Sequence, residues 1–210
     1  MYKIAQVLST IIILITLVTN GYASDKFHID GTTLHYDSFK AKDDINKEIT
    51  FDDVDTFRKV LSANTIELLV LNSDGGFIDA AHEITDLLID FEVDTHIKGE
   101  CFSACYWLFL AGESRTMEKG SRLGFHQSYM TAEDVENHFI ENKDINGWAN
   151  MYEYTVYLYG VTQDDIFKDF EYQLERGVKP SFIIQTIKVS SDKEFYPRRK
   201  VLVDAGVLTD

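Results

Sequence analysis

The 210-residue sequence contains little proline and cysteine, and few basic side chains for the number of acidic ones. It has two prolines and two cysteines, with 20 Lys and Arg against 35 Asp and Glu. The resulting net charge of −15 disfavours nucleic acid and anionic membrane surfaces as partners, because like charges repel. The sequence also lacks repeats and linkers rich in proline or glycine, so we expect one folded unit after the N-terminal segment.

The N-terminal segment is typical of a secretory signal. Lys3 precedes an uncharged apolar stretch, and the small residues Gly21 and Ala23 fit a cleavage site after Ala23. We therefore expect a signal peptide at 1–23, a single domain at 24–210, and an exported protein, periplasmic or secreted. Loss of Lys3 takes the charge from −15 to −16. Without cleavage the segment would be a membrane anchor, although it is short for a bilayer span.

Export would place both cysteines in an oxidising compartment. Cys101 and Cys105 are the only pair available, and they either form a disulfide or remain two buried thiols. Their i, i+4 spacing suits a disulfide only if Cys101 leaves helical geometry. A zinc site would need two further ligands, and no histidine is close in sequence, so we expect no metal.

Apolar periodicity predicts alternating strands and helices. The continuous apolar run at 66–72 is typical of a strand buried on both faces of a parallel sheet. The other predicted elements are a hairpin at 28–36, helices at 51–62, 80–91, 103–110 and 198–205, strands at 93–99, 121–126 and 194–196, and a mainly helical region at 131–189. This order predicts an α/β fold with a mainly parallel sheet, right-handed βαβ crossovers and flanking helices.

Chemically suggestive residues follow three successive strands. The letters SDGG come after the first core strand, GECFSAC follows the second, and His126 ends the third. Ligands bind beyond the carboxyl ends of such strands, so we expect these residues along one edge of the sheet.

Ser103 and His126 are predicted to meet at this edge. A helix of about eight residues carries the chain roughly 12 Å away, and a six-residue strand brings it back by roughly 20 Å. A serine hydroxyl becomes a good nucleophile only when a base within hydrogen-bond reach takes its proton. Taken singly, Ser103 is better explained as a helix cap and His126 as a core histidine, and only their combination favours a nucleophile and its base.

Backbone donors for a developing negative charge are also present in the sequence. Ser103 at a helix start would leave the N–H of Ala104 free, with the helix dipole behind it. Gly75 and Gly76 permit a backbone conformation that turns the N–H of Gly76 toward the same point. Two such donors would form an oxyanion hole.

Three blocks, LNSDGGFIDAAHEI, GECFSACYWLFLAGESR and LGFHQ, resemble in order and spacing those of the Clp protease proteolytic subunit. The C-x-S-A-C context is similar to exported, Clp-protease-like proteins. The resemblance implies a ClpP/crotonase-like fold, a serine peptidase acting on a peptide or protein, and no cofactor. It leaves open whether the chain forms a homo-oligomer.

The resemblance also implies roles for individual residues. By position, Ser103 matches the nucleophile, His126 the general base, and Gly76 and Ala104 the oxyanion donors. Counting back from the C-terminal motif places Glu194 at the acidic position of the triad, with Asp192 as the alternative.

The sequence departs from the family pattern at Asp74, where the family has proline, which brings a carboxylate near the proposed oxyanion site. Two other functions therefore stay open. One is a non-catalytic protein of the same fold that binds peptides or partners. The other is a Ser/Lys peptidase related to signal peptide peptidases, with Lys143 or Lys168 as the base.

Overall fold

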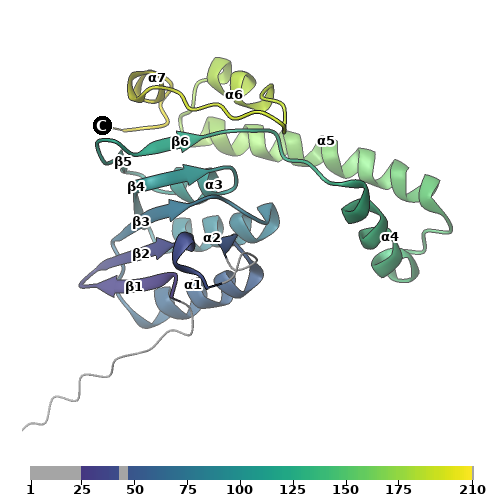
Figure 1. Cartoon of the computed structure of the whole chain (residues 1–210), viewed down its shortest axis with the longest axis horizontal. Coiled ribbons are helices and arrows are strands. Elements are labelled where there is room, and N and C mark those ends of the chain that lie inside the picture. The colour runs from purple at the N-terminus through teal and green to yellow at the C-terminus, as the bar shows by residue number, and fades with distance from the viewer. Residues whose placement is uncertain (1–24, 43–46, 210) are drawn as a thin grey trace, which may run out of the picture.

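The computed structural model describes residues 25–42 and 47–209, which form a six-stranded sheet with helices packed against it (Figure 1). The strands are β1 (Phe27–Asp30), β2 (Thr33–Asp37), β3 (Leu68–Ser73), β4 (Asp94–Phe102), β5 (Arg115–Met117) and β6 (Arg122–Gly124). The hairpin β1–β2 is antiparallel, whereas β2, β3, β4 and β5 are parallel neighbours. Strand β6 pairs with the last three residues of β4. The predicted α/β class with a mainly parallel sheet is confirmed.

The helices divide into a group that covers the sheet and an arm that extends away from it (Figure 1). They are η1 (Ser38–Lys40, a 3-10 turn), α1 (Phe51–Ala63), α2 (Ile78–Asp90), α3 (Cys105–Leu110), α4 (Ala132–Asn146), α5 (Met151–Glu175), α6 (Pro180–Ile187) and α7 (Arg199–Asp204). Helices α1, α2 and α3 pack side by side and lie behind the strands, whereas α4 and most of α5 form the arm.

The core lies between the sheet and helices α1 to α3. Leu69 and Leu71 of β3 and Ile84 and Leu88 of α2 are fully buried, as the apolar run and the helical periodicity predicted. Burying one such side chain stabilises the fold by about 1.5–3 kcal/mol. All six residues of α3 are buried, so this short helix is held by packing rather than by its own length.

A buried carboxylate fixes the start of α1 against the hairpin. Asp53 accepts hydrogen bonds from Lys26 Nζ at 2.7 Å, from the Tyr36 hydroxyl at 3.0 Å and from the N–H of Thr50 at 2.9 Å. Burial, together with the charge and hydrogen bond of Asp53, raises the pKa of Tyr36, so its phenol remains a donor. These contacts hold the chain next to Ile49, which bridges to Gly76 beside the candidate site.

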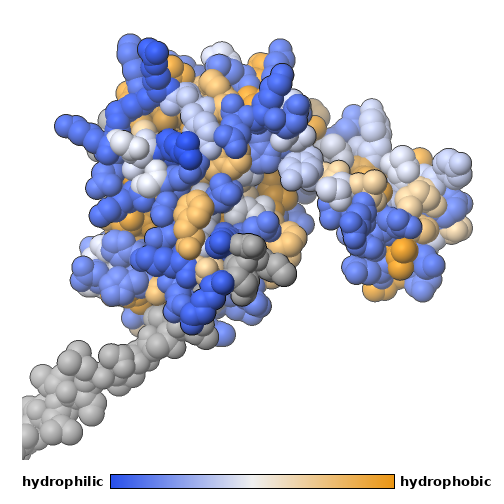
Figure 2. All heavy atoms as spheres, viewed as in Figure 1, coloured by the Kyte–Doolittle hydropathy of each residue, from blue (hydrophilic) through white to orange (hydrophobic). Residues whose placement is uncertain are grey.

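The arm exposes apolar side chains along α5. Tyr152, Val156, Tyr159 and Phe167 are among them, and Figure 2 shows the arm as a lobe separate from the body. Tyr154 is its fully buried aromatic, packed against Trp148. Among the helices of the described residues, none combines the length and the apolar character that a membrane crossing requires.

Several element boundaries differ from the sequence-based expectations. Strand β4 continues to Phe102 because its end pairs with β6, and α3 begins at Cys105 rather than at Ser103. The short strand β5 was not predicted. The strand expected at 194–196 is a single bridge between Phe125 and Phe195. The expected signal at 1–23 lies outside the described residues.

Candidate active site

Strand pairing brings the three candidate segments to one edge of the sheet. Ser73, the last residue of β3, pairs with Cys101 of β4, so the SDGG loop begins beside the serine loop. Phe102 of β4 pairs with Gly124 of β6, two residues before His126. The edge predicted from the sequence therefore gathers all three.

Ser103 lies at a sharp turn between β4 and α3. Its φ of 53° is in the left-handed region, which costs a residue other than glycine about 1–3 kcal/mol. Its N–H donates to the carbonyl of Gly124 at 3.1 Å. Its Oγ lies 2.6 Å from Nε2 of His126, so the two side chains are hydrogen-bonded. Ser103 is not the cap of α3, since Ala104 occupies that position.

A disulfide joins the two sides of this turn. Cys101 in β4 and Cys105 at the start of α3 are bonded, with their Cα atoms 5.3 Å apart, and both are fully buried. The alternative of two buried thiols is thus excluded in this structure. Because Cys101 belongs to a strand, it has left the helical geometry that made the pairing uncertain from sequence. The disulfide therefore links the residues two positions before and two positions after Ser103.

The glycine loop packs directly against the serine turn. A Cβ on Gly75 would lie 2.8 Å from Ser103 Cβ and 2.8 Å from the carbonyl oxygen of Phe102, and φ at Gly75 is 98°. Only glycine fits both the close approach and this backbone conformation. The loop and the turn are therefore in van der Waals contact.

Two backbone N–H groups, one in the glycine loop and one in the serine turn, have no acceptor in the described part of the chain. The carbonyl of Gly75 accepts a hydrogen bond from the N–H of Ile49 at 2.7 Å. The peptide that follows is trans, so the N–H of Gly76 points away from Ile49. Neither this N–H nor that of Ala104 donates a hydrogen bond to any residue that the structure describes.

The imidazole of His126 has one partnered and one unpartnered nitrogen. Its Nε2 contacts Ser103, whereas its Nδ1 is buried and has no hydrogen-bond partner among the described residues. The ring stacks on Phe102, with centroids 4.9 Å apart and an interplanar angle of 13°. A buried nitrogen without a partner is costly, so the packing around this ring has to compensate.

The segment that carries the two candidate acids runs beside His126. Phe195 bridges to Phe125, and the N–H of Gln127 donates to the carbonyl of Val189, so residues 190–194 form an excursion opposite His126. The carboxylate of Asp192 accepts a hydrogen bond from the Ser190 hydroxyl. Glu194 is exposed. Within the described chain neither carboxylate is hydrogen-bonded to His126, and the role of the acid stays a prediction.

Asp74 lies within electrostatic range of the same group of residues. Burial raises the pKa of its carboxyl, and the charges of Glu100 and Glu194 raise it further, while Arg122 and His126 oppose them. Asp74 is nevertheless on the exposed side of the loop. The carboxylate of Asp74 therefore adds negative charge near the candidate oxyanion site.

The lysines of the Ser/Lys alternative lie on the arm. Lys143 is in α4, with its Nζ 6.0 Å from the centroid of Phe139, and Lys168 is in α5. Over residues 25–42 and 47–209, the hydrogen-bond partner of Ser103 Oγ is His126 and not a lysine.

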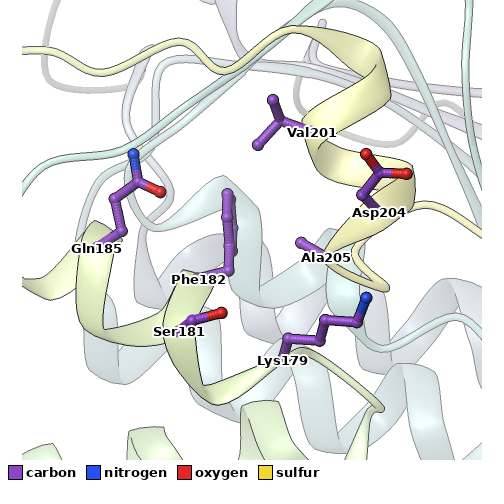
Figure 3. A pocket seen from close by; sticks show the side chains of 7 residues that line it. All are labelled: Lys179, Ser181, Phe182, Gln185, Val201, Asp204 and Ala205. Atoms are coloured by element: carbon purple, nitrogen blue, oxygen red, sulfur yellow. The ribbon is translucent and has the colours of Figure 1, made fainter.

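Within the described chain no group of side chains resembles a metal site. A small pocket on the surface lies apart from Ser103. Within residues 25–42 and 47–209, no three His, Cys, Asp or Glu side chains are grouped to hold a metal ion. A small open pocket lies between α6 and α7, with the ring of Phe182 directed into it (Figure 3). None of its lining residues belongs to the serine–histidine site.

Sequence reasoning missed the aromatic residues next to His126. Phe102 and Tyr196 stack with their centroids 5.6 Å apart, and Tyr196 donates to Glu100 at 2.6 Å. The pairing of Phe102 with Gly124 depends on the register between β4 and β6, which sequence periodicity does not supply. The available sequence signal was that Arg122, Gly124 and His126 are spaced by two residues, which places them on the same face of a strand.

Fold and site together define an α/β protein that places a hydrogen-bonded serine–histidine pair at the carboxyl ends of parallel strands. Among solved structures, the chain is similar to a ClpP1 mutant from Listeria monocytogenes, at 20% identity and a TM-score of 0.48. The match covers 77% of this chain and 84% of that one, and it concerns the fold alone. Family models and curated protein sequences give no match.

Proposed function

We propose that the protein is an exported serine hydrolase that acts as a peptidase. The observation that carries the proposal is the 2.6 Å contact between Ser103 Oγ and His126 Nε2 at a left-handed turn between a strand and a helix. This geometry leaves the hydroxyl at the edge of the sheet with a base in reach of its proton. The free N–H groups of Gly76 and Ala104 support it.

In this proposal Ser103 Oγ attacks the carbonyl carbon of a peptide bond while His126 Nε2 takes the hydroxyl proton. The N–H groups of Gly76 and Ala104 bind the oxyanion. His126 then gives the proton to the leaving amine, and water releases the acyl group by the reverse proton path. An acid from the excursion at 190–194, Glu194 or Asp192, would hold the imidazole after a change of side-chain conformation. The proposed partner is thus a peptide or protein.

Export is proposed from two features. The first is the expected signal at 1–23. The second is the buried disulfide Cys101–Cys105, because such bonds persist in oxidising compartments. Expression with and without residues 1–23 tests the first feature: we expect the full chain to be processed after Ala23 and recovered outside the cytoplasm.

A fluorophosphonate probe tests the hydrolase proposal, because it modifies only an activated serine. We expect labelling of the wild type, loss of labelling in Ser103→Ala, and strong reduction in His126→Ala. The matched control is Ser62→Ala, which removes an exposed serine of α1 away from the site. Labelling that is absent from the folded wild type, or equal in Ser103→Ala, contradicts the proposal.

A second function is favoured by one observation. The buried Nδ1 of His126 has no hydrogen-bond partner among the described residues, as expected of a site without a catalytic acid, and a non-catalytic peptide-binding protein of the same fold has no need of one. Such a protein would bind peptides equally well as wild type and as Ser103→Ala, without labelling either.

A further inference from the structure

In the structure His126 is held by an aromatic stack rather than by a hydrogen bond to Nδ1. Its ring lies nearly parallel to that of Phe102, and no described residue partners Nδ1. A single hydrogen bond through Nε2 leaves the imidazole free to rotate about the line to Ser103 Oγ. The face of Phe102 removes that freedom.

Phe102 is itself held in place by Tyr196. The two rings stack with centroids 5.6 Å apart and planes 24° from parallel. They meet above Gly124, where a Cβ would lie 2.3 Å from Tyr196 Cε1 and 2.4 Å from Phe102 Cδ2. The absence of a side chain at Gly124 therefore creates the space in which the stack forms.

Tyr196 is anchored by charged residues of the two paired strands. Its hydroxyl donates to Glu100 Oε1 at 2.6 Å, and Glu100 Oε2 accepts from Arg122 at 2.6 Å. The guanidinium of Arg122 also lies over the Tyr196 ring, 4.7 Å from its centroid. Burial and the hydrogen bond to Glu100 raise the pKa of Tyr196, so the phenol keeps its proton and remains a donor.

We propose that Phe102 and Tyr196 are positioning residues of the site, which orient the imidazole of His126 toward Ser103. This inference rests on the proposed function and extends it. In this role neither ring takes part in the chemical steps. They act through His126, and the pair of Glu100 and Arg122 fixes the far end of the stack.

The first test separates positioning from binding in the reaction with the fluorophosphonate probe. In Phe102→Leu, kinact should fall roughly 10- to 100-fold, the cost of misplacing a catalytic group by about 1 Å, while KI changes little. Phe102→Tyr should restore the rate, because it keeps the aromatic face. Tyr196→Leu should lower kinact, and Tyr196→Phe, which keeps the ring, should lower it less. Phe91→Leu, at the end of α2, is the control.

The second test does not depend on activity. Stacking shields the ring protons of His126, so their NMR signals, assigned by their loss in His126→Gln, should move downfield in Phe102→Leu. Unchanged kinact in a folded Phe102→Leu variant, or unchanged His126 signals, overturns the inference. If Phe102→Leu does not fold, Tyr196→Leu, which lies outside the strands, decides the same question. A wild type that is not labelled contradicts the proposed function, and the NMR result then still decides the positioning.

Discussion

Reduction of the disulfide should lower the labelling rate of Ser103 strongly while it lowers Tm only modestly. The bond closes a loop with a sequence separation of only 4. For so short a loop, the loss of unfolded-state entropy is worth about 2 kcal/mol. A chain of this length loses about 2–4 °C of Tm per kcal/mol, so we expect a decrease of about 4–8 °C on reduction.

The labelling rate is more sensitive than Tm because Ser103 is held in an unfavourable conformation inside that loop, so a similar free energy is enough to displace it. Its left-handed φ of 53° costs about 1–3 kcal/mol, which the surrounding contacts must outweigh. If reduction allows the turn to relax by about 2 kcal/mol, the fraction with Ser103 against His126 falls roughly 25-fold, since 1.4 kcal/mol is tenfold. The labelling rate should fall by the same factor.

The assay compares the labelling rate and Tm of the oxidised wild type, the reduced wild type and the double variant Cys101→Ala/Cys105→Ala. The double variant should match the reduced protein and should not respond to reductant, which controls for effects elsewhere. A reduced protein that stays folded and is labelled at the oxidised rate would refute the reasoning. So would a loss of labelling that follows global unfolding alone.

Two further predictions concern the glycine loop and the contact between α2 and α5. Gly75→Ala should lower labelling by at least roughly tenfold, because the added Cβ meets Ser103 at 2.8 Å; the rate relative to Ser62→Ala measures it. Burial lowers the pKa of His82, but its hydrogen bond to Asp169 and the charges of Asp169, Asp79 and Asp165 raise it above its usual value overall. The stabilisation is complete below the usual histidine pKa of 6.5 and is lost as pH rises through the raised pKa, so Tm should fall as pH rises above 6.5. His82→Gln should flatten this dependence, and an unchanged profile would contradict the assignment.

The fold was predictable for segments whose own apolar pattern shows which side chains are buried. The apolar run around Leu69 and Leu71 marks a strand buried on both faces, and the helical spacing of Ile84 and Leu88 marks the face of α2. Both patterns arise because buried positions are apolar, and the spacing of apolar residues therefore indicates the type of element. The three-residue strand β5 was not predicted, because it exists through pairing with β4 rather than through its own sequence, whereas β6 lies within the strand predicted at 121–126.

The sequence predicted which residues of the site meet, but it did not predict which contacts hold them in place. The alternation of strands and helices returns His126 to Ser103, because parallel strands end at one edge. The disulfide stayed open because the i, i+4 spacing suits a bond only if Cys101 leaves helical geometry, and the sequence did not show that Cys101 belongs to β4. Phe102 and Tyr196 come from positions whose contact requires the register of two separate pairings.

The restraints that touch Ser103 and His126 directly act on the backbone and rings rather than through charges. The disulfide and Gly75 fix the turn at Ser103, and the stack of Phe102 on Tyr196 fixes the face of His126. The carboxylates of Glu100 and Glu194 meanwhile lie within electrostatic range of Asp74, which also lies within range of His126. A carboxylate held on Nδ1 would add to that repulsion, whereas an aromatic face orients the imidazole without adding charge. Stacking therefore orients the imidazole without adding a further carboxylate to those already near the site.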